Sequence, residues 1–154
     1  MLALKARRHA AVAAAIILVG SACSRGSGIS PAIRELVRES KTGTMQLADA
    51  TPFTWDQVYL FDPYTPRSEV CRALRIQADE CVRLVPFEST DDGEMSIAFL
   101  QHGQLIHYTA HSRSNGDFAP APAAQPLSAK SAVFRIVREE TAGERRFLLR
   151  LVES

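Results

Sequence analysis

The sequence predicts an α+β domain, built from a mostly antiparallel sheet of about six to seven strands with two short helices. Short segments with alternating apolar residues recur through the chain, and most of the connections are too short to cross over between parallel strands. Two other segments repeat their apolar residues at helical spacing instead. Residues 31–154 are enough chain for one domain with a hydrophobic core.

The first half of the domain is expected to read helix, strand, strand, helix. Pro31 behind Ser30 favours a helix to about residue 40, because proline is preferred at the first helical position. Extended segments follow over residues 44–47 and 54–61, and a second helix over 67–76. The segment 54–61 is apolar on both faces, so we expect it to be a central strand. Its two faces carry Phe53, Trp55, Tyr59 and Phe61 on one side and Val58 and Leu60 on the other.

The second half is expected to consist of strands. One begins at Cys81 and runs to residue 87, and a hairpin pairs residues 95–100 with 105–111 around a tight turn. In residues 105–111 the side chains of Ile106, Tyr108 and Ala110 alternate with those of His107, Thr109 and His111, which predicts one solvated face. A Pro- and Ala-rich loop precedes a last hairpin of residues 132–138 and 145–152.

The N-terminus has the pattern of an export signal. Lys5, Arg7 and Arg8 precede an apolar block over residues 10–20, which leads to Ser-Ala-Cys at residues 21–23. A helix over this block and the next two residues would span roughly 20 Å, short of the about 30 Å of a bilayer core. The segment is therefore expected to be a signal peptide over residues 1–22 rather than a spanning helix.

This segment resembles a bacterial lipoprotein signal, in which small residues precede an acceptor cysteine. Ser21 and Ala22 match, whereas Gly20 stands where leucine is usual. The resemblance implies that Cys23 carries the lipid and that the protein faces the periplasm of a bacterial cell envelope; Ser24 implies sorting to the outer membrane. Ordinary signal peptidase cleavage, giving a soluble periplasmic or secreted protein, is the alternative.

The chain after the signal is close to neutral. Removing the three basic residues of the signal leaves 15 of the 18 basic side chains against 17 acidic ones, a net charge of −2. Nucleic-acid binding depends on a strong positive field, so we expect no nucleic-acid partner. Residues 23–30, rich in Gly and Ser, are expected to be a flexible tether to a membrane.

The three cysteines divide into one and two. If Cys23 carries a lipid, Cys71 and Cys81 remain, and an exported chain favours a disulfide between them. The alternative is that both are reduced and packed as small apolar side chains. No second pair of metal ligands at zinc-finger spacing accompanies them, so neither a metal nor a cofactor is expected.

The most distinctive motif is Trp-Asp-Gln-Val-Tyr-Leu-Phe-Asp-Pro-Tyr-Thr-Pro over residues 55–66. It resembles a W-D-x-V-Y-x-F-x-P-Y-T-P signature of uncharacterised small bacterial envelope proteins and lipoproteins, which implies no particular activity. Its aromatic residues favour a core face, and its prolines favour a rigid turn from strand to helix. A recognition surface formed by Asp56, Asp62 and Tyr64 is the functional alternative.

A basic stripe is the second candidate surface. Arg146 and Arg150 are expected to point away from Phe147, Leu149 and Leu151, toward anionic lipid, phosphate or an acidic partner. Glutamates near the turn would neutralise much of this charge, and a solvated, internally paired face is the alternative.

Catalytic motifs are absent from the sequence, including G-x-S-x-G, S-x-x-K and H-E-x-x-H. His107 and His111 lie roughly 13 Å apart on a strand, too far for one ion. We therefore expect a non-catalytic interaction or structural module that contacts an envelope protein or an anionic envelope component. One alternative is a small periplasmic hydrolase or transferase using His107 or His111 with Asp117 or Asp56.

A second alternative is a binder of a small apolar or lipidic ligand. It would need a cavity within the curved sheet, lined by aromatic side chains from different strands: Phe87, Phe99, Tyr108 and Phe134.

Overall fold

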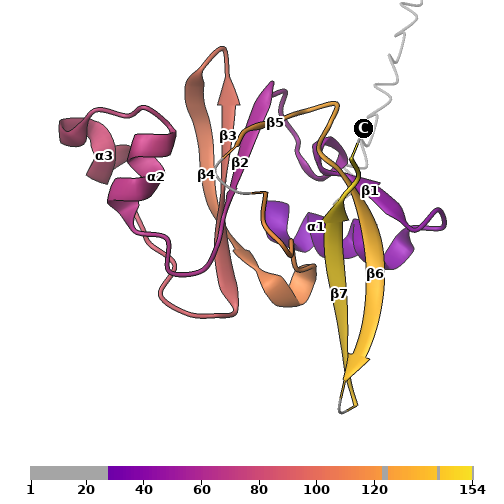
Figure 1. Ribbon diagram of the computed structural model, residues 1–154. Coiled ribbons are helices and arrows are strands. Elements are labelled where there is room, and N and C mark those ends of the chain that lie inside the picture. Colours follow the sequence, from indigo (N-terminus) through magenta and orange to yellow (C-terminus); the bar gives the residue numbers. More distant parts are fainter. Residues whose placement is uncertain (1–27, 123–124, 142, 154) are drawn as a thin grey trace, which may run out of the picture.

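The computed structural model describes residues 28–122, 125–141 and 143–153, and these residues form an α+β fold with seven strands in two antiparallel sheets (Figure 1). The predicted fold class is confirmed, although the strands divide between two sheets and three α-helices form instead of two. The helices are α1 (Ile29–Glu39), α2 (Arg67–Ala73) and α3 (Ala78–Leu84), with short 3-10 turns η1 (Leu47–Ala50) and η2 (Arg113–Asn115). The strands are β1 (Thr44–Gln46), β2 (Gln57–Phe61), β3 (Glu94–Gln101), β4 (Gln104–Ser112), β5 (Leu127–Ser128), β6 (Val133–Thr141) and β7 (Glu144–Leu151). The signal peptide and Cys23 lie outside the described residues.

The larger sheet has the order β4-β3-β2-β5. Strands β3 and β4 form the predicted hairpin, with Met95 opposite His111 and a bulge near Phe99. Strand β2 lies inside the sheet, paired with β3 on one side and with β5 on the other. The expectation of a central strand at this motif is therefore confirmed.

The smaller sheet has the order β1-β6-β7, and the β6–β7 hairpin extends away from the larger sheet (Figure 1). Residue Asp117 joins the two parts of the fold. Its backbone N–H donates to Phe147 O at 2.8 Å and its carbonyl accepts from Leu149 N at 2.7 Å, so it makes a parallel bridge on the outer edge of β7.

Two apolar clusters lie on opposite faces of the larger sheet. The first contains Val58 and Leu60 of β2 and packs against α1 and the smaller sheet. The second contains Phe61 and packs against α2 and α3, with Tyr59 at its margin. Alternate residues of β2 thus serve different clusters, which is why its sequence is apolar throughout.

The predicted grouping of Trp55 with Tyr59 and Phe61 is wrong. Trp55 and Phe53 belong to the first cluster, where both rings contact Phe99 edge-on. They precede the start of β2, so the strict alternation of a strand does not extend back to them.

The strand expected from Cys81 to residue 87 is also wrong, because Cys81 lies in helix α3. Cys81, Leu84 and Val85 recur at helical spacing, Asp79 and Glu80 occupy the first turn where the helix dipole favours acids, and a proline follows the helix. The second helix correspondingly ends at Ala73, before the expected residue 76.

The predicted disulfide between Cys71 and Cys81 is confirmed and links α2 to α3 across a Cα–Cα distance of 5.8 Å. At the N-terminus, α1 already begins at Ile29, so the expected tether is shorter than residues 23–30. Among the described residues, no helix is both long and apolar enough to cross a membrane.

Candidate functional site

The structure divides the predicted surface residues between the two ends of the larger sheet. Asp56 precedes β2, whereas Asp62 and Tyr64 follow it, and a strand of this length separates them by roughly 16 Å. Arg146 lies near the β6–β7 turn, at the end where β2 finishes, and Arg150 lies near the opposite end of the hairpin (Figure 1). The five residues therefore do not form one surface.

Asp56 has a structural contact. Its Oδ2 accepts a hydrogen bond from the backbone N–H of His102 at 2.7 Å, in the tight turn between β3 and β4. His102 adopts a positive φ of 52°, so this bond stabilises a backbone conformation that is unfavourable for a non-glycine residue. The interaction supports the hairpin.

Tyr64 is exposed at the start of the connection from β2 to α2. Its side chain is 56% exposed, and its φ of 63° lies in the left-handed region. The carbonyl of Asp62 accepts bonds from the N–H and the hydroxyl of Thr65, which hold this turn. An exposed aromatic residue on a strained backbone is a feature often found at recognition sites.

A buried carboxylate organises the end of the molecule where Arg146 lies. Asp117 is 2% exposed and accepts two bonds from Arg113, Nε to Oδ1 at 2.8 Å and Nη2 to Oδ2 at 2.9 Å. Arg146 donates a third bond, Nη2 to Oδ2 at 2.8 Å. One aspartate thus positions two guanidinium groups from different parts of the fold.

These arginines line a cleft of about 670 Å³ between the end of the larger sheet and the start of β7. We call it the arginine cleft. Its lining residues are Asp92, Gly93, Arg113, Ser114, Glu144, Arg145, Arg146 and Phe147.

The electrostatics of the arginine cleft are mixed. Hydrogen bonding to Asp117 raises the pKa of Arg113 above its ordinary value, partial burial opposes this, and the charges of Asp62 and Asp92 raise it further. Within the described part of the chain, no carboxylate oxygen lies within 4.0 Å of the guanidinium of Arg145.

Arg150, the second residue of the predicted basic stripe, does not line the cleft. Arg150 lies 3.9 Å from Glu139 in an exposed ion pair, and Arg138 stacks over the ring of Phe147 at 5.8 Å. Exposed pairs of this kind contribute little to stability. The alternative of an internally paired face therefore applies to Arg150, which pairs with Glu139.

His111 is fully buried and its hydrogen bonds determine its tautomer. Its Nε2 lies 2.7 Å from the carbonyl of Gly116, which can only accept, so Nε2 carries the proton. The Nδ1 atom then accepts from the Ser30 hydroxyl at 2.9 Å, and that oxygen accepts in turn from Ser112 N–H and Asn115 Nδ2. Burial lowers the pKa of His111, which agrees with a neutral ring.

The expected solvated face of β4 is therefore wrong. Burial of His111 shows that its face packs against α1, and His107 on the same face lies 5.2 Å from the ring of Phe53. Between the described residues, no hydrogen bond joins either histidine to Asp117 or Asp56. The contacts of His107 and His111 are those of packed side chains.

The four aromatic residues expected around a ligand cavity lie on opposite sides of the larger sheet. Phe99 and Phe134 are fully buried in the first cluster. Phe87 lies against Tyr108 at 4.7 Å, and Tyr108 packs on the second cluster. These side chains do not line a common cavity.

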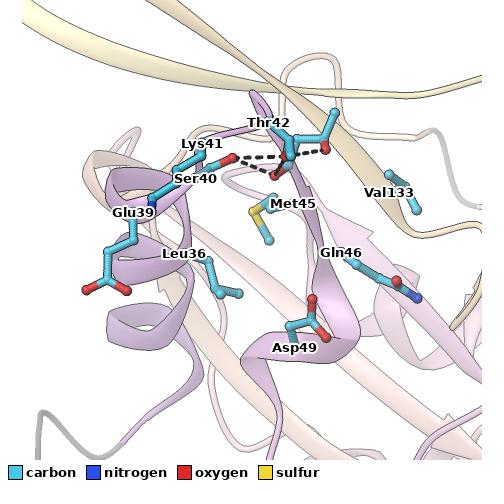
Figure 2. A pocket seen from close by; sticks show the side chains of 10 residues that line it. Leu36, Glu39, Ser40, Lys41, Thr42, Met45, Gln46, Asp49 and Val133 are labelled. Atoms are coloured by element: carbon cyan, nitrogen blue, oxygen red, sulfur yellow. Dashed lines mark hydrogen bonds between the residues drawn. The ribbon is translucent and has the colours of Figure 1, made fainter.

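A second hollow, of about 410 Å³, lies between α1, β1 and η1 (Figure 2). The hydroxyls of Ser40 and Thr42 face each other across the turn that ends α1, and Ser40 Oγ donates to Thr44 O at 2.8 Å. Asp49 and Gln46 line the other side. The hydroxyls satisfy backbone groups of the turn, so the structure assigns them a local role.

Comparison with known proteins found no matching family model, no matching curated protein and no matching solved structure. In the described ranges, no group of three or more His, Cys, Asp or Glu side chains is placed to hold a metal ion. The arginine cleft is the candidate site, because it brings Arg146 together with Arg113 and Asp117. Sequence reasoning missed Arg113, for which the only signal was its spacing of four residues from Asp117.

Proposed function

We propose that this chain is a lipid-anchored protein of the bacterial cell envelope, held through Cys23, and that its domain is a non-catalytic interaction module. Its contact surface is the arginine cleft, and its partner is an envelope component that carries phosphate or carboxylate groups. The observation that supports this surface most directly is the pair of guanidinium groups, Arg113 and Arg146, oriented by one buried carboxylate.

A guanidinium recognises an oxyanion through a planar fork of N–H donors, and its affinity is highest when the fork is already oriented. Asp117 supplies this orientation, since it bonds to both groups while Arg146 keeps more than half of its side chain exposed. Two arginines share the charge of one aspartate, and Arg145 adds a third positive charge beside them. The remaining acidic residues of the cleft, Asp92 and Glu144, would favour a small anionic group over an extended polyanion.

The surface can be tested with phosphatidylglycerol incorporated at increasing fractions into the neutral detergent micelles that hold the full chain. Binding is measured by calorimetry, with inorganic phosphate as a soluble competitor that separates headgroup phosphate from lipid contacts. We expect the double variant Arg145→Gln/Arg146→Gln to bind about tenfold or more weakly and binding to weaken with salt. The control is Arg135→Gln, which removes an exposed arginine from the same hairpin at its other end. Equal binding by both variants contradicts the proposed surface.

The anchor is tested separately by Cys23→Ser in cells. We expect the variant to leave the membrane fraction, because a lipid chain contributes about 0.8 kcal/mol for each buried methylene. Retention in the membrane fraction would mean that an uncleaved helix or another protein holds the chain, and it would contradict lipid anchoring without bearing on the arginine cleft.

A further inference from the structure

The two sheets of this fold present four edge strands, and three of them are protected against pairing with other chains. Strands β1 and β5 are only three and two residues long. Strand β7 carries Glu144, Arg145, Arg146 and Arg150, and the bridge from Asp117 occupies the middle of its outer edge. Short length, charge and coverage are the common means by which proteins prevent edge-to-edge association.

The fourth edge, strand β4, is neither short nor charged, and among the described residues its outward backbone groups are bonded by another segment only at the Ser112 end, by Ser30. It is nine residues long, with the sequence Gln-Leu-Ile-His-Tyr-Thr-Ala-His-Ser. It contains no Asp, Glu, Lys, Arg or Pro, and Ile106 keeps 41% of its surface exposed. A long, uncharged edge strand with an exposed apolar side chain is expected to pair with another strand.

The hydrogen-bond pattern identifies the open positions on this edge. Arg113 N–H donates across to Gly93 O, whereas Ser112 N–H donates outward to the Ser30 hydroxyl. In an antiparallel pair, inward and outward residues alternate, so Tyr108 and Ala110 direct their N–H and C=O groups away from β3. Ala110 O receives a local bond from the Thr109 hydroxyl at 3.2 Å and keeps a second lone pair.

Across the described ranges, no other chain segment donates to or accepts from the backbone of Tyr108 or Ala110 on this side. The helix α1 reaches the edge only at the Ser112 end, through Ser30. The part of β4 from Ile106 to Ala110 is therefore open for pairing.

We infer that β4 is a dimerisation edge, at which a second copy of this chain adds its own β4 in antiparallel orientation and continues the larger sheet across the two molecules. Pairing centred near Tyr108 and Ala110 would satisfy their outward groups in both copies. It would also remove Ile106 of each copy from water, near the strand of the partner.

A second copy suits this edge because the strand offers no charge to attract a charged partner strand and no charge to repel its own copy. An antiparallel arrangement about a two-fold axis presents the same residues on both sides, the isologous contact of most homodimers. The inference does not depend on what the arginine cleft binds.

The test measures the oligomeric state of the full chain in neutral detergent by sedimentation equilibrium. We expect the wild-type chain to be a dimer. Ile106→Lys puts a charge where the partner strand would cover an apolar side chain, and we expect dimer dissociation to become about tenfold or more favourable because that charge loses water on pairing. The matched control is Val82→Lys, an equally drastic change of a 64% exposed residue on α3, which we expect to leave the dimer intact.

A second variant removes only a hydrogen bond. Ala110→Pro deletes an N–H that points away from β3. Proline is tolerated at such outward positions of an edge strand, so we expect the pairing with β3 to be retained and the dimer to be weakened. Circular dichroism checks that each variant is folded. A monomeric wild-type chain at about 100 μM overturns the inference, and so does a dimer that Ile106→Lys and Val82→Lys weaken equally.

Discussion

The substitution Asp117→Asn tests the physical basis of the arginine cleft. The side chain keeps its shape but loses its charge, and one of its two acceptor oxygens becomes an amide donor. Arg113 then loses one of its two bonds in either orientation of the amide, and Arg146 also loses its bond when the amide nitrogen replaces Oδ2, because an amide N–H cannot accept from a guanidinium. The backbone bridge from Asp117 to β7 is unchanged, so the effect isolates the side chain.

The expected magnitude follows from the burial of the partners. Removing one member of a buried ion pair costs about 3–5 kcal/mol. The carboxylate is almost fully buried and the Arg113 side chain is 28% exposed, so this pair accounts for most of the effect. The Arg146 side chain is 53% exposed, and solvent screening reduces its share to less than about 1 kcal/mol. We expect the free energy of unfolding to fall by about 3 kcal/mol.

Urea unfolding measures this difference, with the slope of the transition checking that the unfolded state is unchanged. The control Asp92→Asn removes an exposed carboxylate whose oxygens make no described hydrogen bond, and it should change stability by less than about 0.5 kcal/mol. Arg146→Gln alone should cost less than about 1 kcal/mol. A loss below about 1 kcal/mol for Asp117→Asn would refute the assignment of Asp117 as the organising charge.

Two further predictions concern the disulfide and the buried histidine. In the same urea assay, the free energy of unfolding of the double variant Cys71→Ala/Cys81→Ala should fall by on the order of 3 kcal/mol, because a bridge of sequence separation 10 no longer restricts the unfolded chain. An unchanged urea midpoint would contradict this. Burial lowers the pKa of His111 in the folded state, so the unfolded chain binds its proton first as pH falls. Stability should therefore be independent of His111 above about pH 6.5 and decrease as pH falls through the lowered folded-state pKa. His111→Asn should flatten this dependence, and equal pH slopes in variant and wild type would argue against it.

Local patterns explain which parts of the fold were predictable. The β3–β4 and β6–β7 hairpins each have two arms rich in apolar residues, joined by a turn that contains Gly103 or Gly143, both at positive φ. The interior position of β2 followed from its apolar residues on both faces. These features depend on neighbours in the sequence, so they can be read without knowing the tertiary structure.

Choices made by tertiary packing were not predictable. Alternation along β4 shows that two faces exist, but the burial of His111 depends on Ser30, which is 81 positions away. The helix around Cys81 is different, because its acidic first turn and helical apolar spacing are local signals, so the strand predicted there was a wrong choice between two periodicities. The contact of Arg146 with Asp117 joins residues 29 positions apart, so neither sequence spacing nor composition could indicate it.

The hydrogen bonds of Ser30 have a mechanical consequence. Any pulling force on the N-terminal segment enters the domain at the first turn of α1. Ser30 connects this turn directly to Ser112, His111 and Asn115, at the end of β4. The load therefore passes into the larger sheet within the first turn of α1, through the polar contacts of Ser30 and through the core packing of Ile29 just before it.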